Sequence, residues 1–330
     1  MYKISRVFHP VGQGAFYSER HEGFNIVYDC GTEYIKRTDK SIKRTVETAF
    51  SQNDEIDILF ISHFDYDHVG HINTLKSRVK KIKKVVLPLL HNETKILLSS
   101  FYKVLGATDV ATLISNPEDF FGEGTIIIEV ELSENGETPI SDNLESTDIN
   151  SFNTNRKIIS GSGISKKFLN YEWIYIPYNY DYKKRNSTLE EELIEKWFTQ
   201  DEVNKLKTNE NYILDVVISK KADLRNTYDS LPGKINQNSM IVYSGMLKPT
   251  NNYYESYSLF YNSCCMDDYF HHRFLRRCFH ENKVGCIYTG DTDLKIVKIK
   301  SIFTIYWNSV GLVQIPHHGD IKSFDEDILR

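Results

Sequence analysis

Short apolar runs that end in turn residues alternate along the chain with stretches of helical periodicity. The runs at 2–8, 25–28 and 85–88 predict strands, because each is short and is bounded by polar or glycine residues. Between the last two runs, apolar side chains recur at helical spacing from Ile72 to Ile82. Strands that alternate with helices predict an α/β architecture rather than a helical bundle.

The densest polar cluster directly follows one apolar run. Residues 56–61 lead into His63-Phe64-Asp65-Tyr66-Asp67-His68, in which four side chains can bind a metal. A strand that ends in a tight loop can bring alternating residues to one point, and imidazole and carboxylate groups suit zinc, manganese or iron. A polar loop without a metal is the alternative, but four metal-capable residues in this order arise rarely by chance.

Three later strand ends also carry polar side chains. They are Asn236-Gln237-Asn238-Ser239 before the apolar run at 240–243, Thr289-Gly290-Asp291 after 286–288, and His317-His318-Gly319 after 313–316. Each signal is weak alone. Together with the first cluster they form a defined order along the chain: His/Asp, Asn/Ser, Gly-Asp, His-His-Gly.

Length and charge narrow the class of protein. We expect a single domain over residues 1–330, with an elaborated insertion at 91–231. A formal net charge of −5 argues against wholesale electrostatic binding to nucleic acid. No apolar run approaches the ~18 residues of a membrane span and no signal-peptide core is evident, so we expect a cytoplasmic protein with no membrane partner. The cysteines and histidines between 264 and 286 match no common zinc-site spacing, and we interpret them as a packed helix.

The motifs resemble the metallo-β-lactamase superfamily, and within it the branch typified by the hydrolase domain of the ComEC competence proteins. The resemblance spans nearly the whole chain and rests on Val11-Gly12-Gln13-Gly14, Asp29-Cys30-Gly31, the motif at 62–70, the Asn/Ser strand start, and the motifs at 288–291 and 316–319. It implies an α/β fold, the four-layer αββα sandwich of two mixed sheets flanked by helices. The metals would lie at the edge where the two sheets meet.

The resemblance also implies a role for each metal-capable residue. His63 and Asp65 would bind a first ion. Asp67 and His68 would bind a second ion, and Asp291 would bridge the two. Both ions would be divalent, zinc or manganese in the first place and iron less readily. Asp65 stands where most zinc members have a histidine, and this harder ligand shifts the preference toward manganese or iron without excluding zinc.

Other residues complete the implied site. His317 or His318 would be the last ligand of the second ion, and the sequence leaves open which. Asn236 or Asn238 falls where much of the superfamily has a histidine ligand, and with Ser239 these side chains would orient a ligand or contact the substrate. Asp29 would orient a ligand histidine or hold the loop, since metal-binding imidazoles usually need a partner for their other nitrogen.

The implied reaction is hydrolysis by a hydroxide that bridges two ions about 3.5–4 Å apart. Asp67 and Asp291 are the side chains that we expect to be catalytic. On family grounds we favour a nuclease or other phosphodiesterase. The alternatives are a carboxyl-ester or lactam hydrolase of the same fold, and a non-catalytic binding or regulatory module of a multi-protein bacterial defence system.

Two features bear on partners. The segment from Lys76 to Lys84 carries six basic side chains, with no acidic residue between Val69 and Leu90. Such a run either guides a nucleic acid or nucleotide substrate toward the site or is a solvated helix face, and the two interpretations have equal weight. Only twelve residues follow His318, whereas relatives usually continue, so a protein partner that completes the C-terminus is a further expectation.

Overall fold

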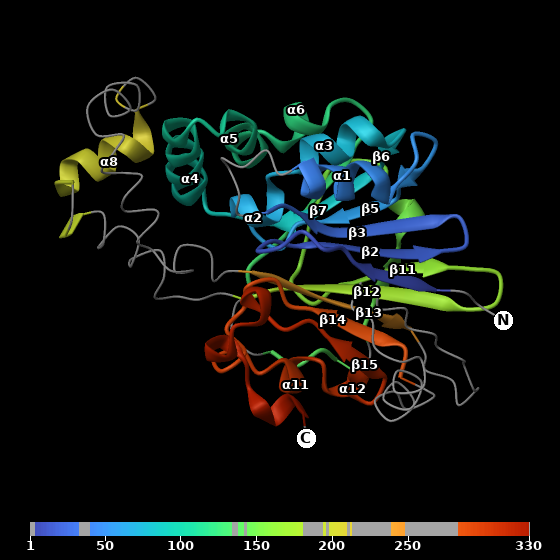
Figure 1. Cartoon of the computed structure of the whole chain (residues 1–330). Helices are drawn as coiled ribbons and strands as arrows, with labels where there is room; N and C mark the ends of the chain where they lie inside the picture. Colours follow the sequence, from blue (N-terminus) through green and yellow to red (C-terminus); the bar gives the residue numbers. More distant parts are fainter. Residues whose placement is uncertain are drawn as a thin grey trace.

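Two mixed β-sheets face each other, and helices cover their outer faces (Figure 1). The computed structural model describes residues 4–32, 40–133, 138–141, 144–180, 194–195, 198–209, 212, 239–247 and 283–329. The order of the layers is helices, sheet, sheet, helices. The predicted four-layer αββα sandwich is confirmed.

The first sheet has seven strands in the order β1-β2-β3-β5-β7-β8-β10. Their bounds are Ser5–Phe8 (β1), Phe16–His21 (β2), Phe24–Cys30 (β3), Ile58–Phe60 (β5), Lys84–Pro88 (β7), Ile126–Val130 (β8) and Arg156–Ile158 (β10). β1, β2 and β3 pair antiparallel, and the strands from β3 to β10 pair parallel. Beside this sheet lies a parallel pair, β4 (Glu55–Ile56) with β6 (Lys81–Ile82).

The second sheet has six strands in the order β15-β14-β13-β12-β11-β9. Their bounds are Val310–Val313 (β15), Gly285–Tyr288 (β14), Met240–Met246 (β13), Glu172–Asn179 (β12), Gly163–Lys167 (β11) and Ser146–Asp148 (β9). The four strands from β14 to β11 pair antiparallel, while the two outermost pairings are parallel. This sheet lies under the first one in Figure 1.

Helices close both outer faces. Over the first sheet lie α1 (Lys40–Ala49), α2 (Tyr66–Val69), α3 (Ile72–Arg78), α4 (Asn92–Leu105), α5 (Thr108–Ser115) and α6 (Pro117–Phe121), and α8 (Gln200–Thr208) packs on α4. Under the second sheet lie α11 (Ile299–Ile302) and α12 (Thr304–Trp307). Short 3-10 turns occur at Ile149–Ser151, His317–Gly319, Ile321–Ser323 and Glu326–Leu329. No helix among these described residues is long and apolar enough to cross a membrane.

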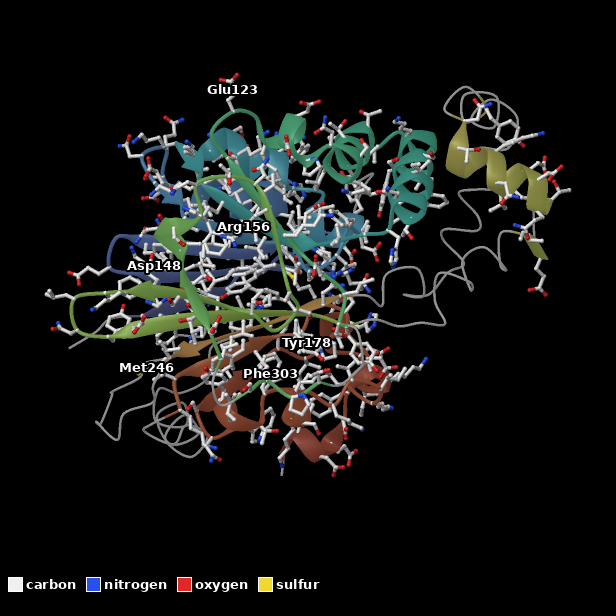
Figure 2. All side chains as sticks on the ribbon, turned by 180° about the vertical axis from the view of Figure 1, so that it is seen from behind. Glu123, Asp148, Arg156, Tyr178, Met246 and Phe303 are labelled. Atoms are coloured by element: carbon white, nitrogen blue, oxygen red, sulfur yellow. The ribbon has the colours of Figure 1, made fainter. Side chains whose placement is uncertain are left out.

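Side-chain alternation along the strands produces three apolar layers. In β7, Val85 and Leu87 point to the helices of the first sheet, while Val86 points into the core between the sheets. A third core lies between the second sheet and α11–α12, where the rings of Tyr178 and Phe303 meet edge to face with centroids 6.3 Å apart (Figure 2). Each sheet is therefore apolar on both faces.

One carboxylate is completely buried between the sheets. Glu19 on β2 accepts from Arg6 Nε at 2.7 Å and from Ser244 Oγ at 2.9 Å, and its Oε1 lies 2.9 Å from His21 Nε2. Burial alone would raise the pKa of Glu19, but Arg6 and His21 outweigh it and lower that pKa to about 2. The buried charge is thus paired and hydrogen-bonded.

Several predicted strands and helices can be compared directly with the observed ones. The strands expected at 2–8, 25–28 and 85–88 are β1, β3 and β7. The helix expected from Ile72 to Ile82 ends earlier, at Arg78, because the chain turns there into β6. Residues 251–282, which contain most of the cysteine- and histidine-rich segment, lie outside the described residues.

The range 91–231 is more than an addition to the fold. It contains β8 and β10 of the first sheet and β9, β11 and β12 of the second, so residues 126–179 belong to the sandwich itself. The division into a single domain with an elaborated insertion at 91–231 stays a prediction. These strands were hidden because polar connections separate them in the sequence, and only pairing across the sheets identifies them.

The basic segment 76–84 spans the end of α3, β6 and the start of β7, so it is not one helical face. Several of its side chains form ion pairs. Arg78 lies 2.8 Å from Glu47 Oε1, and the Nζ atoms of Lys80 and Lys83 each lie 2.9 Å from a Glu55 oxygen. β7 runs parallel to β5, so its first residues lie at the opposite end of the sheet from the loop that follows β5. The segment gives no support to the expectation that it guides a polyanion to the His/Asp cluster.

Candidate metal centre

The metal-capable side chains lie where strands of both sheets meet at one edge of the sandwich. The loop after β5 and the short α2 carry residues 63–68, Asp291 follows β14, and the 317–318 pair follows β15. Met240 N, at the start of β13, donates to Ser62 O at 2.8 Å. A main-chain hydrogen bond therefore joins the two sheets beside the site.

Two glycines allow three backbone segments to pack at Asp67. A Cβ on Gly31 would lie 2.4 Å from the Asp67 carbonyl carbon, and a Cβ on Gly14 would lie 2.3 Å from Gly31 O. Ala15 N donates to Asp67 O at 3.0 Å. The Gly-Gln-Gly and Asp-Cys-Gly sequences thus fix the backbone of the residue whose side chain lies at the middle of the centre.

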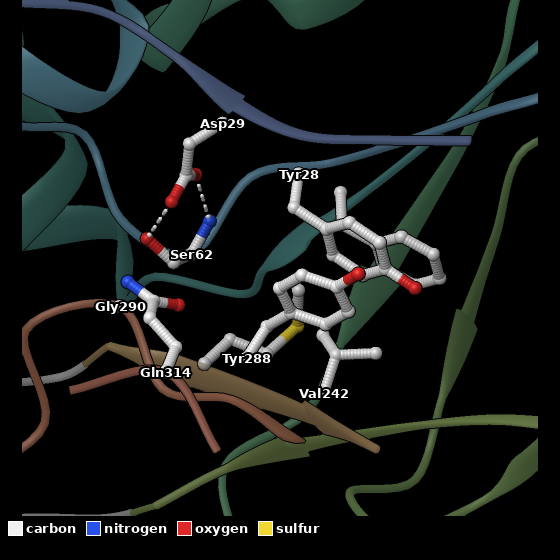
Figure 3. Close-up of a pocket in the computed structure, with 9 residues that line it drawn as sticks. Tyr28, Asp29, Ser62, Val242, Tyr288, Gly290 and Gln314 are labelled. Atoms are coloured by element: carbon white, nitrogen blue, oxygen red, sulfur yellow. Dashed lines mark hydrogen bonds between the residues drawn. The ribbon is translucent and has the colours of Figure 1, made fainter. Parts of the chain in front are cut away.

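Asp29 determines the protonation of a buried imidazole. Its Oδ1 accepts from Ser62 N at 2.7 Å, and its Oδ2 accepts from Ser62 Oγ at 2.7 Å and from His68 Nδ1 at 2.9 Å; Figure 3 shows the two bonds to Ser62. An ionised carboxylate only accepts, so His68 carries a proton on Nδ1. Asp29 holds this geometry at a φ of +52°, in a region that non-glycine residues rarely occupy.

The same carboxylate acts on His63 through Ser62. The Ser62 hydroxyl proton points to Asp29, so Ser62 Oγ accepts from His63 Nδ1 at 2.9 Å. Ser239 Oγ lies on the same side of the ring, also 2.9 Å from Nδ1. The Nε2 atoms of His63 and His68 are buried and have no hydrogen-bond partner among the described residues. Two imidazole lone pairs directed into one space fit a bound metal ion.

Carboxylates and a third imidazole surround that space. The candidate ligand atoms form two groups, and within each group all of the atoms lie within 4.8 Å of one another. One group is His63, Asp65 and Asp67, and the other is Asp67, His68, Asp291 and His318. Asp67 is common to both groups. Asp291, which the resemblance placed between the ions, lies in the second group, with its Oδ2 3.8 Å from His63 Nε2.

Charge is concentrated in this space. Burial would lower the pKa of His68, but Asp291, Asp29 and Asp67 outweigh it and raise that pKa well above its usual value. Burial would raise the pKa of Asp291, yet His68 and His317 hold it well below its usual range. For Asp65, burial raises the pKa, and Asp67 and Asp291 add to the rise. Such a crowded set of carboxylates favours a bound cation.

The structure separates the two histidines that the sequence left equivalent. His318 Nε2 lies 2.9 Å from Asp67 Oδ2 and belongs to the second ligand group. His317 lies outside that group, with its Nδ1 3.2 Å from Asp291 Oδ2. Both residues have positive φ angles, +48° and +54°, so the loop holds a strained conformation that directs the two rings differently. The geometry favours His318 as the ligand.

The other predicted residues divide into two sets. Ser239 lies behind His63, where it accepts from Asp291 N at 2.9 Å and so supports two candidate ligands at once. Asn236 and Asn238 lie outside the described residues. One contact was missed by the sequence: Tyr102 on α4 places its hydroxyl 3.4 Å from Asp65 Oδ1. An aromatic side chain on an amphipathic helix gave no signal that separates it from the core.

Exposure of the side chains shows from which side a substrate can reach the centre. His68 and His63 are 1% and 3% exposed, whereas Asp67 and His318 are each 20% exposed. Beneath the centre, Asp29 and Ser62 also line a cavity of about 10 Å³ between the sheets (Figure 3). That cavity holds one water molecule at most, so the Asp67–His318 side is the more open side of the centre among the described residues.

Comparison with known families agrees with this geometry. Residues 11–141 match the model of the metallo-β-lactamase superfamily. This part of the chain is similar to that superfamily. The match includes the Gly-Gln-Gly turn and the His/Asp cluster, and the superfamily implies a metal-dependent hydrolase. The ComEC-like branch stays a prediction.

The solved structures that resemble this chain share little sequence with it. An archaeal metallo-β-lactamase superfamily protein from Sulfolobus tokodaii is 13% identical, with a TM-score of 0.24, and the match covers 52% of this chain and 54% of that one. A candidate metallo-β-lactamase from Thermotoga maritima is 12% identical, with a TM-score of 0.23, over 53% of this chain and 69% of that one. The chain thus spans about half the length of the first of them. No curated protein matches the sequence.

Replacing Asp29 tests how the candidate metal centre orients its imidazoles. In Asp29→Asn an amide would face His68 Nδ1 and move the imidazole proton to Nε2, the nitrogen that a metal needs. We expect metal affinity to fall about 10- to 100-fold, as for other partners of ligand histidines. Competition with a chromogenic chelator measures it. Asp148→Asn is the control, since Asp148 also accepts a main-chain hydrogen bond but on the remote strand β9. Unchanged affinity in Asp29→Asn would contradict the tautomer assignment.

Proposed function

We propose that this protein is a dinuclear metallohydrolase that cleaves phosphodiesters, with a nucleic acid or a nucleotide as substrate. The observation that carries the proposal is the pair of ligand groups that share Asp67, each with a buried imidazole nitrogen that lacks a hydrogen-bond partner among the described residues. Two such groups in one space are the arrangement that a pair of divalent ions requires. Bound there, the ions would activate water and stabilise the charge that develops on phosphate.

The two ions would favour a phosphoryl group. They would bring four positive charges to a space that holds three carboxylates, those of Asp65, Asp67 and Asp291, and a bound hydroxide would balance the fourth. A phosphodiester would place an anionic oxygen against the ions in both the ground state and the transition state, whereas a neutral ester or lactam would do so only in the transition state.

The protein's own groups prepare the site before a substrate arrives. Asp29 and Ser62 bond the Nδ1 atoms of two imidazoles, so in each neutral ring Nε2 is the nitrogen that can bind a metal. Ser239 fixes the backbone of Asp291, and His317 holds one oxygen of the same carboxylate. His63, His68 and Asp291 are therefore each oriented by hydrogen bonds to groups outside the ligand set, which is the arrangement that catalysis by fixed charges needs.

A panel of substrates tests the proposal. Purified protein loaded with zinc or with manganese is assayed on single-stranded DNA, duplex DNA, RNA, an aryl phosphodiester and an aryl carboxyl ester. We expect cleavage of the phosphodiesters and little of the ester. Cleavage of the carboxyl ester alone would transfer the assignment to an ester or lactam hydrolase. Failure to retain metal under every loading condition would exclude the enzyme.

A further inference from the structure

The two ligand groups differ in chemistry. The group of His68, His318, Asp67 and Asp291 offers two imidazole nitrogens and two carboxylates. The group of His63, Asp65 and Asp67 offers one nitrogen and two carboxylates. Among the described residues, the second of these groups is thus the smaller and the richer in oxygen.

Ser239 does not make up the difference. It begins the strand at which the resemblance expected a further ligand, but its hydroxyl lies on the Nδ1 side of His63, away from Nε2. The hydroxyl also accepts the amide proton of Asp291 at 2.9 Å. Ser239 is therefore engaged in supporting other ligands, and it cannot reach the space that the His63 Nε2 faces.

The supporting contacts differ in the same way. Asp29 bonds His68 of the nitrogen-rich group directly, and it reaches His63 of the oxygen-rich group only through Ser62. The oxygen-rich group has a further contact in Tyr102, whose hydroxyl approaches Asp65 Oδ1 while Asp65 Oδ2 faces His63 Nε2 at 3.4 Å. Tyr102 comes from α4, an element outside the His/Asp motif, and its side chain is almost completely buried. One carboxylate oxygen is thus directed to the helix and the other to the ligand space.

We propose that the two metal positions are unequal: the nitrogen-rich position retains zinc, and the oxygen-rich position exchanges its ion, prefers manganese and depends on Tyr102 as a positioning residue. Imidazole ligands suit zinc, whereas carboxylate and water ligands suit manganese. With three protein ligands among the described residues, this position also leaves coordination sites for water or substrate. This inference rests on the proposed dinuclear site, and it assigns the exchangeable ion to the Asp65 side.

Stepwise loading of the metal-free protein tests the inequality without any assay of activity. One equivalent of zinc is added first, manganese is then titrated, and the free manganese is followed by its electron paramagnetic resonance signal. Elemental analysis after dialysis gives the retained ions. We expect one zinc to remain and one manganese to bind and to be lost on dialysis.

Variants locate each ion. Tyr102→Phe removes only the hydroxyl, and we expect it to weaken manganese binding about 10-fold while zinc binding stays unchanged. His318→Asn is expected to do the reverse. Tyr306→Phe is the matched control, since Tyr306 is a buried tyrosine in the remote core under the second sheet.

Separate outcomes overturn separate claims. Two ions of either metal that bind with equal affinity, or a loss of zinc rather than manganese in Tyr102→Phe, would refute the unequal positions and leave the dinuclear hydrolase intact. A protein that binds neither metal would refute the proposed function itself. The circular dichroism spectrum of each variant, compared with that of the original protein, separates a local effect from misfolding.

Discussion

Asp67→Asn is expected to lower kcat/KM for a phosphodiester by about 1,000-fold or more, because Asp67 lies in both ligand groups. Loss of several kcal/mol of charge stabilisation corresponds to a factor of that size. Asparagine has nearly the same shape, so the contacts of the Asp67 backbone with Ala15 and Gly31 should survive. Steady-state kinetics on an aryl phosphodiester, together with elemental analysis, measure activity and retained metal.

A matched variant shows whether the position or the lost charge is responsible. Asp201→Asn changes an exposed aspartate in the first turn of α8, and we expect it to leave both activity and metal content unchanged. Near-normal kcat/KM in Asp67→Asn, with a folded protein, would mean that the reaction does not pass through this centre.

The largest effect on stability is expected far from the metals, at Glu19. Glu19→Leu leaves Arg6 without its carboxylate partner in the core between the sheets, where the Arg6 side chain is only 17% exposed. Breaking a buried ion pair in this way costs about 3–5 kcal/mol. Urea unfolding should therefore show a clearly lower midpoint for Glu19→Leu.

The double variant Arg6→Met/Glu19→Leu is the control for this effect. Replacing both partners by apolar residues of similar size is often neutral, so much of the lost stability should return. A double variant as unstable as Glu19→Leu would show that the cost comes from packing or from the bonds to Ser244 and His21 rather than from an isolated charge.

The pH dependence of stability should follow the same residue. The folded protein lowers the pKa of Glu19 from 4.5 to about 2. The stabilisation is therefore complete above pH 4.5 and is lost as the pH falls from 4.5 toward 2, because the unfolded chain binds the proton first. Unfolding midpoints measured across this range should fall more steeply for the original protein than for the double variant. Equal slopes would contradict the assignment.

The sequence predicted the parts of the site that depend on local order. Polar residues directly after an apolar run must lie at a strand end, so residues 63–68 and Asp291 were identified without a structure. The contact between Tyr102 and Asp65 joins positions 37 residues apart, and that between Ser239 and His63 joins positions 176 residues apart. Contacts of this kind depend on how helices and sheets pack, which periodicity does not specify.

The basic segment 76–84 shows what local order did not predict. No acidic residue lies near its charges in the sequence, so both interpretations left these side chains without carboxylate partners. In the structure, Glu47 of α1 pairs with Arg78, and Glu55 of β4 pairs with Lys80.

The choice between His317 and His318 also depended on contacts that form only in the folded chain. Only the folded loop determines that His318 contacts Asp67 while His317 contacts Asp291.

The candidate ligands come from both sheets of the sandwich. Residues 63–68 follow β5 of the first sheet, while Asp291 follows β14 and His318 follows β15 of the second sheet. An ion held by both sets would act as a removable cross-link between the sheets at the edge where Met240 already bonds Ser62. Metal supply would then govern the mechanical integrity of the sandwich as well as its chemistry, because binding to the folded form alone adds to its stability. Folding and reactivity would respond together to the concentration of one ion.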